Sequence, residues 1–230
     1  MILNRFIRMI WMGRPQNKVK IKWSPDFAYA IGLLTTDGNL SSDGRHFDLT
    51  SQDKEQLLNF RACLEIKNKI GQKISGQTQR KVFRIQFGDV NFYRFLLRVG
   101  LTENKSKTLG KLEIPNQYFF DFLRGHLDGD GTFHSYWDPR WKSSFMFYTI
   151  FISASKEHIN WLQKKIFELA KIRGHLTKAR NNSCYNLRYA KRESLTLLPK
   201  IYSKNGCVRL SRKYLKIKRA LAIIGEGNLI

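Results

Sequence analysis

The amino-acid sequence predicts an α+β protein built from two pseudo-symmetric halves, each with the element order αββαββα. Two observations predict this fold. The same succession of apolar helical runs and short strands occurs twice, with a period of about a hundred residues. In each copy the first helical run ends in Asp-Gly, at Asp37 and again at Asp130. We expect a leader over residues 1–21, a first half-domain over 22–112 and a second half-domain over 113–230.

The first half begins with an apolar helix expected over residues 26–36. Ser24 is its predicted cap, and Pro25 stands at the first helical position. A short hairpin follows, with Asp43-Gly44 as its turn signal. We then expect a helix over 53–66, a strand pair over 71–89 and a helix over 90–99. Residues 100–116 are rich in Lys and Thr and are predicted to connect the halves.

The second half repeats this plan with a longer hairpin. A helix is expected over residues 118–128, followed by a strand pair with Asp138-Pro139 at its tip. A helix over 156–171, a strand pair over 174–191 and a helix over 192–202 complete the repeat. A last, basic helix is expected over 211–224.

Alternating residues in the strands separate an apolar face from a polar one. Ile85 and Phe87 alternate with Arg84 and Gln86. A polar face on a single strand is also what an ordinary solvated surface shows. With a net charge of +23 over the chain, however, we expect the apolar face to pack on helices and the polar, basic face to lie along a DNA groove.

Composition narrows the class of protein. The chain has 41 Lys and Arg against 18 Asp and Glu, a net charge of +23. Because 42% of residues are hydrophobic and 13% aromatic, this charge belongs to a folded body, not to a disordered tail. A polyanionic partner is therefore expected, with nucleic acid ahead of an anionic membrane surface.

The sequence also indicates an intracellular protein. Three scattered cysteines are too few for a disulfide framework or a zinc ribbon, which favours a reducing compartment. No targeting signal or membrane-spanning stretch is apparent, so we expect a soluble, unsecreted protein of a prokaryotic cytoplasm or an organelle. Residues 1–21 read either as a basic amphipathic surface helix or as a loosely packed leader.

The two Asp-Gly helices share further features. Each has a glycine inside the helix, Gly32 and Gly125, at a cost of about 1 kcal/mol against alanine. This placement predicts that the helices touch backbone to backbone. We expect Gly38 and Gly131 to adopt the left-handed conformation that ends a helix.

The predicted position of the two aspartates favours a divalent cation. At the carboxyl ends of adjacent helices, each carboxylate is disfavoured by about 0.3–1 kcal/mol, and two together are worse. A cation between them reverses this effect. Mg²⁺ suits hard oxygen ligands and takes one or two carboxylates with water and phosphate oxygens.

These residues carry a family resemblance. AIGLLTTDG and LRGHLDGDG resemble the signature helices of the LAGLIDADG homing endonucleases, in the single-chain, two-motif form. The flanks WSPDF and IPNQYFF and the closing LLPKIYSKNGCVRLSRKYLKIKRAL are similar in kind. The similarity covers about residues 22–220. The copies differ at the sixth position, Thr35 against Asp128.

The resemblance implies a saddle of two antiparallel sheets over the DNA major groove, with the signature helices at the centre. It implies that Asp37 and Asp130 hold Mg²⁺, with the carbonyls of Thr36 and Gly129 as further ligands; Mn²⁺ or Ca²⁺ can substitute for binding. The reaction would hydrolyse one phosphodiester in each strand and leave short 3′ overhangs. One chain would cut both strands as a monomer.

Two further catalytic residues match family positions. Gln52, at the end of its predicted strand, matches a family polar residue by its spacing from the following helix, although its second-half counterpart is Ala154. Lys191 matches a family lysine, and its first-half counterpart is Asp89.

Side chains expected to contact DNA lie in strands, where they would meet base edges, or in hairpin tips, where they would meet phosphates. They are Arg45, His46, Arg80, Arg84, Gln86, Arg140, Lys142, Lys178, Arg180 and Arg188.

Two alternatives to a double-strand DNA endonuclease remain open. An RNA maturase, with intron RNA as partner, is compatible with intact acids. A non-cleaving DNA-binding regulator would use the same scaffold, but no helix-turn-helix appendage is visible. A general RNA-binding protein would leave the paired Asp-Gly ends unexplained. The terminal residues of a self-splicing protein are missing, so a free-standing, intron-encoded enzyme is expected.

Overall fold

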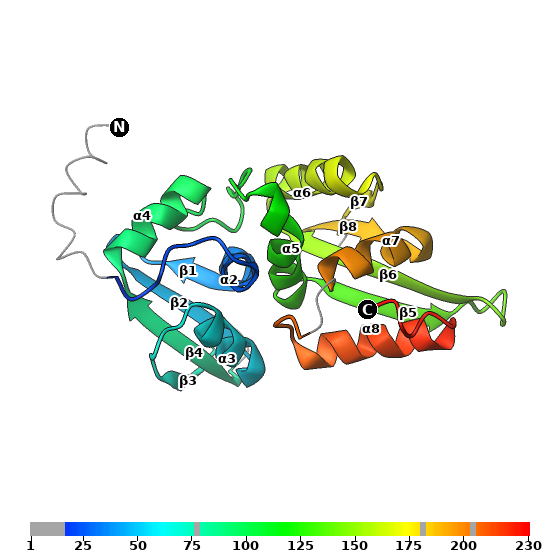
Figure 1. Ribbon diagram of the computed structural model, residues 1–230, viewed down its shortest axis with the longest axis horizontal. Helices are drawn as coiled ribbons and strands as arrows, with labels where there is room; N and C mark the ends of the chain where they lie inside the picture. Colours follow the sequence, from blue (N-terminus) through cyan, green and yellow to red (C-terminus); the bar gives the residue numbers. More distant parts are fainter. Residues whose placement is uncertain (1–16, 76–78, 180–182, 203–205) are drawn as a thin grey trace.

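The computed structural model describes residues 17–75, 79–179, 183–202 and 206–230 (Figure 1). Within these residues the chain forms seven α-helices, one short 3₁₀ turn and two four-stranded antiparallel sheets. Each sheet belongs to one half, and the helices α2 and α5 lie side by side between them. The predicted α+β fold with two αββαββα halves is confirmed.

The first half contains elements that follow the predicted order. Its sheet has the strand order β1-β2-β4-β3, with neighbours antiparallel. The elements are α2 (Pro25–Thr36), β1 (Gly38–Leu40), β2 (His46–Ser51), α3 (Lys54–Cys63), β3 (Ile70–Ile74), β4 (Lys81–Gly88) and α4 (Val90–Val99).

The second half has the equivalent strand order β5-β6-β8-β7. A 3₁₀ turn, η1 (Asn116–Tyr118), leads into its first helix. The elements are α5 (Phe119–Asp128), β5 (Thr132–Trp137), β6 (Phe145–Ser153), α6 (Lys156–Ala170), β7 (His175–Lys178), β8 (Tyr185–Tyr189), α7 (Lys191–Ile201) and the additional α8 (Ser211–Ile223).

The start of α2 is as predicted. The Ser24 hydroxyl accepts a hydrogen bond from the Phe27 N–H at 3.1 Å, and Pro25 opens the helix without an N–H to satisfy. α2 is buried over most of its length. Because both halves pack on it, the helix needs apolar residues on nearly all sides.

The internal glycines allow α2 and α5 to meet at the backbone, as predicted. A Cβ atom on Gly32 would overlap the Phe122 carbonyl and lie 2.9 Å from the Gly125 Cα. A Cβ on Gly125 would overlap the Tyr29 carbonyl. Any larger residue at these two positions would push the helices apart.

The prediction of left-handed glycines after these helices is wrong. Neither Gly38 nor Gly131 is among the residues with positive φ. Each glycine is required instead by crowding against its own helix. A Cβ on Gly38 would lie 2.6 Å from the Leu34 carbonyl oxygen, and one on Gly131 would lie 2.7 Å from the Leu127 Cα.

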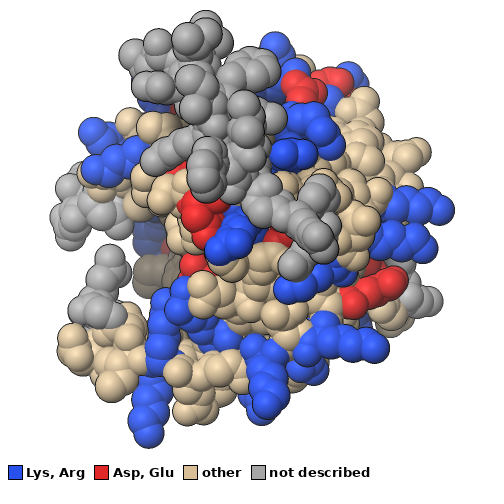
Figure 2. All heavy atoms as spheres, turned by 90° about the vertical axis from the view of Figure 1, so that its left-hand side faces the viewer, with Lys and Arg blue, Asp and Glu red and all other residues tan. Residues whose placement is uncertain are grey.

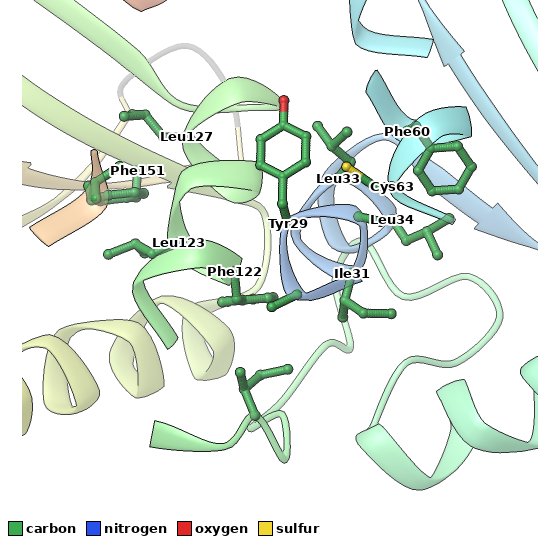
Figure 3. Close-up of a cluster of buried hydrophobic side chains, with 14 of the residues drawn as sticks. Tyr29, Ile31, Leu33, Leu34, Phe60, Cys63, Phe122, Leu123, Leu127 and Phe151 are labelled. Atoms are coloured by element: carbon green, nitrogen blue, oxygen red, sulfur yellow. The ribbon is translucent and has the colours of Figure 1, made fainter. Parts of the chain in front are cut away.

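The core lies on the helix side of both sheets. Phe47, Leu49 and Ile85 are buried there, as their alternation predicts. In Figure 3, Leu34 of α2 extends toward Phe60 of α3, and Tyr29 projects between α2 and α5. Apolar burial therefore joins the halves through the two central helices.

The segment expected to be a plain connector is packed. Its residues Leu101, Leu109 and Leu112 are buried, and Lys105 is only 6% exposed. Part of the expected leader is packed as well: the N–H groups of Lys18 and Val19 donate to the Asp89 carboxylate at 2.8 and 3.0 Å. Residues 1–16 lie outside the described part of the chain. Among the described residues, no helix has the length and apolar character that crossing a membrane requires.

Candidate active site

The crossing of α2 and α5 brings their two acidic ends together. Asp37 caps the C-terminus of α2, where its N–H donates to the Leu33 carbonyl at 2.9 Å. The Asp37 carboxylate lies against the second motif, because a Cβ placed on Gly129 would be 2.8 Å from Asp37 Oδ2. Asp130 follows Gly129 directly. The predicted juxtaposition of the motif ends is therefore present.

Each carboxylate is held in an environment that disfavours its charge. Burial, followed by the neighbouring Asp130 carboxylate, raises the pKa of Asp37 from 3.8 to about 6. Burial also raises the pKa of Asp130, although its own surface is exposed to solvent. The Asp130 side chain reaches solvent on one side and is surrounded by protein on the others.

Gln56 is the polar side chain that contacts Asp37 directly. Its Nε2 donates to Asp37 Oδ2 at 2.6 Å, and its Oε1 accepts from the Ser51 hydroxyl at 3.0 Å. The predicted Gln52 lines the same open pocket as Asp37 and Gly129, but no hydrogen bond joins it to the acid. Gln56 was missed because glutamine on the first turn of a helix carries no distinctive pattern.

Lys213 of α8 caps the C-terminal end of α5. Its Nζ donates to the carbonyl oxygens of Leu127, Asp128, Gly129 and Gly131 at 2.7–2.9 Å. These carbonyls form the negative end of the helix dipole. An ammonium group there stabilises the helix end beneath the acidic pair.

Lys105 has the equivalent place beside α2. Its Nζ donates to the Gly38 carbonyl, and Gly38 is the first-motif counterpart of Gly131. Burial lowers the pKa of both Lys105 and Lys213 from 10.5 to about 8, against the opposing effect of nearby carboxylates. The site therefore contains two acids and two lysines, one pair from each half.

Lys191 is not brought to this site. Its Nζ donates to the Phe145 carbonyl at 3.1 Å. Phe145 pairs with Trp137 at the far end of β5, a strand that begins just after Gly131 and spans roughly 20 Å. The lysines that do reach the acids come from the packed connector and from α8.

Asp128 links α2, α5 and α8. Its Oδ2 accepts hydrogen bonds from the Tyr29 hydroxyl at 2.8 Å and from the Leu210 N–H, at the start of α8, at 2.7 Å. Burial raises the pKa of Asp128 to about 6. This buried carboxylate fixes the N-terminus of α8 and, through it, the position of Lys213.

The open face of the first sheet holds several of the predicted DNA contacts. Arg84 Nε is 3.1 Å from Asp48 Oδ2, so the guanidinium is fixed on this face. His46 pairs with Asp43, and Arg45 lies 3.6 Å from the same carboxylate, in the β1–β2 hairpin. Gln86 and Arg80 are exposed on or beside β4.

The second half places its predicted contacts differently. Arg188 is exposed on the open face, and Arg140 and Lys142 are exposed at the β5–β6 tip. Lys178 pairs with Tyr185, so it lies on the face of the sheet opposite to that of Arg188. It does not share the open face with the other strand residues. Arg180 lies outside the described residues.

Positive charge is spread beyond these side chains. Figure 2 looks at the end of the first half, and Lys and Arg gather along the lower part of this face, where Asp and Glu are few. This distribution agrees with a polyanionic partner.

The residues at the helix ends fit a divalent cation only in part. No group of three or more His, Cys, Asp or Glu side chains that could hold a metal occurs in the described ranges. Two desolvated carboxylates make a hard oxygen donor set, but the Gly129 carbonyl, a predicted ligand, accepts a hydrogen bond from Lys213. A site of this kind would rely on water and phosphate oxygens for its remaining ligands.

Comparison with known proteins supports the fold. No family model and no curated protein matches the sequence. The solved structures that are similar to the chain include the following three. Meganuclease I-SmaMI bound to uncleaveable DNA has 13% identity and a TM-score of 0.57 and covers 90% of this chain and 94% of its own. I-DmoI in complex with DNA and Mn has 13% identity and a TM-score of 0.52, and the match covers 79% of this chain and 98% of the I-DmoI chain.

The third is full-length DUF199/WhiA from Thermatoga maritima, with 14% identity, a TM-score of 0.55 and coverage of 96% of this chain. The chain spans 65% of the length of that protein. The chain thus has the LAGLIDADG fold, which is present both in homing endonucleases and in WhiA.

Proposed function

We propose that this protein is a sequence-specific, metal-dependent endonuclease that hydrolyses one phosphodiester in each strand of duplex DNA and leaves short 3′ overhangs. The observation that carries the proposal is the meeting of Asp37 and Asp130 at the crossed ends of α2 and α5. Two raised carboxyl pKa values mark an arrangement that is unfavourable without a cation.

In this proposal the residues of the chain have distinct roles. Asp37 and Asp130 hold Mg²⁺, and Gln56 orients the Asp37 carboxylate through its 2.6 Å hydrogen bond. When bound, the metal polarises the phosphoryl oxygen, activates water and neutralises the leaving oxygen. Lys105 and Lys213 supply positive charge beside the two scissile phosphates.

The proposed substrate is a duplex laid across the open faces of the two sheets. Basic residues on the first sheet and at the hairpin tips would contact base edges and phosphates. The net charge of +23 favours tight, salt-dependent binding. I-SmaMI and I-DmoI, which share the fold, are described in complexes with DNA.

The test begins with selection of cleaved sites from a randomised duplex library in Mg²⁺. Asp37→Asn and Asp130→Asn should each abolish double-strand cleavage of the selected site and keep metal-independent binding. Asp26→Asn is the matched control, because Asp26 is exposed at the opposite end of α2, roughly 17 Å away. Parental double-strand cleavage by either active-site variant would refute the catalytic assignment.

A second candidate is a DNA-binding protein that does not cleave. One observation favours it: the Gly129 carbonyl, expected to bind metal, accepts a hydrogen bond from Lys213 at 2.9 Å. Selective binding by the unmodified protein, with no cleavage in Mg²⁺ or Mn²⁺, would support this candidate. The RNA maturase alternative predicts comparable binding to a structured intron RNA, and a competition experiment tests it.

A further inference from the structure

The two sheets can be compared residue by residue, because their strands pair in the same register. Counting from each Asp-Gly, the chain places equivalent residues on equivalent strands. The row Asn39, Asp48, Gln86 of the first sheet corresponds to the row Thr132, Ile150, Arg188 of the second. In the next row, Thr50 and Arg84 correspond to Ile152 and Asn186.

The open face of the first sheet is charged and polar. Arg84 and Lys73 both approach the Asp48 carboxylate, at 3.1 and 3.9 Å. His46 and Gln86 extend the same face. Such side chains can donate to and accept from base edges.

The open face of the second sheet has a different chemistry. Asp48 and Thr50 are replaced by Ile150 and Ile152. The rings of Tyr136 and Tyr148 stack on this face with centroids 6.4 Å apart and planes within 12°. Arg188 is the one Lys, Arg, Asp or Glu among the described strand residues of this face. The apolar side chains of this face are half-buried and lie along β6, with the uncharged polar residues Thr132 and His134 on one side and Asn186 on the other.

Duplex DNA is the occupant that the surroundings of this face favour. This sheet lies across the central helices α2 and α5 from the first sheet (Figure 1). The exposed Arg188 and the exposed cations Arg140 and Lys142 lie on it and at its hairpin tip, where they complement phosphates. A protein partner is an alternative outcome of the test below.

We propose that the second half recognises thymine 5-methyl groups, so that its half of the target is rich in A·T pairs. Ile150 and Ile152 offer no hydrogen-bonding group to a base edge, so they cannot read the polar groups that A·T and G·C pairs both present in the major groove. Apolar contact with the thymine methyl is the direct readout open to such side chains. This inference rests on the proposed DNA binding but does not require cleavage.

The test replaces thymine by deoxyuridine in one half of the selected target at a time, which removes only the methyl group. Affinity is measured by a mobility-shift titration without divalent metal. Each methyl lost from the half bound by the second sheet should weaken binding about 4-fold. The same change in the other half should alter affinity less than about 2-fold.

Variants assign the effect to this face. Ile150→Ala and Ile152→Ala should each lower the penalty for deoxyuridine in that one half, and the more conservative Ile150→Thr should do the same if alanine lowers the folded fraction. Ile223→Ala is the matched control, because Ile223 is 52% exposed on α8 and outside the sheet. It should leave the penalty unchanged.

The outcomes separate the two proposals. No DNA binding would refute the proposed function. Tight binding with no methyl dependence in either half, or with equal dependence in both, would refute this inference alone. If the methyl dependence persisted in the Ile150 and Ile152 variants, another part of the protein would recognise the methyl groups and the inference would be overturned. Self-association abolished by those variants, with unchanged methyl dependence, would assign the face to a protein contact and overturn the inference.

Discussion

Replacing Asp37 with asparagine should stabilise the fold while it abolishes cleavage. The carboxylate is partly buried and lies beside Asp130, and these two effects raise its pKa from 3.8 to about 6. Holding the ion in the folded state above pH 6 therefore costs on the order of 3 kcal/mol. Asparagine has the same shape and still accepts the hydrogen bond from Gln56 through its amide oxygen.

Part of that cost is screened by solvent, since Asp37 is partly exposed. If roughly half of the cost remains after screening, Asp37→Asn should raise the free energy of unfolding by about 1–2 kcal/mol at pH 7.5. This corresponds to about 3–6 °C in Tm for a chain of this size. The sign follows from linkage. Between pH 3.8 and 6 the folded protein holds the Asp37 proton that the unfolded chain releases, so rising pH destabilises the parent more than the variant, which keeps only the raised carboxyls of Asp128 and Asp130.

Differential scanning calorimetry over pH 3.5–8 without divalent metal tests this expectation. The difference in Tm should be absent below pH 4, should grow between pH 4 and 6, and should be constant above pH 6. Added Mg²⁺ should raise the Tm of the parent more than that of the variant. A variant equal to or less stable than the parent at pH 7.5, with Asp26→Asn unchanged, would refute the view that the two carboxylates destabilise each other.

Three further perturbations test other contacts. Gly32→Ala should destabilise the fold by about 1–3 kcal/mol or more in urea denaturation, because its methyl overlaps the Phe122 carbonyl; an unchanged midpoint would contradict close helix packing. Tyr29→Phe should cost about 1 kcal/mol of unfolding free energy, because Asp128 loses a buried donor. If Tyr29→Phe cost the same in a protein that already carries Asp128→Asn, the two residues would not interact. Lys213→Met should lower the rate of cleavage more than it lowers DNA affinity. A cleavage rate equal to that of the parent at every pH from 6 to 9 would exclude a role for this lysine.

The duplicated features were predictable because they are local and chemically distinctive. Glycine destabilises a helix interior, so Gly32 and Gly125 indicate close helix packing, and the structure shows that packing. Asp37 and Asp130 follow at fixed distances from these glycines. Hence the meeting of the helices could be derived before any coordinate was known.

The lysines of the site were not predictable by the same means. Lys105 lies in a segment whose composition suggests a solvated connector, and Lys213 lies in a basic helix with many other cations. The two lysines contact equivalent carbonyls but do not occupy equivalent positions in the sequence repeat, so no repeated motif marks them. Lys191 was favoured by its place before a helix, but the register of β5 and β6 takes it to the far end of the sheet.

The gathered charges suggest why both lysines are needed. Two acids at the negative ends of two helix dipoles would repel each other and would repel DNA phosphates. Lys105 and Lys213 cancel the formal charge of the acids before any cation or substrate arrives. In the proposed function, a dication and two phosphates would bring equal and opposite charge into a site that is already balanced. The lysines are not equivalent, because Lys213 is held by several carbonyls of α5 and Lys105 by the Gly38 carbonyl. The fold is therefore pseudo-symmetric in its backbone and asymmetric in its site, as it is in the chemistry of its two open faces.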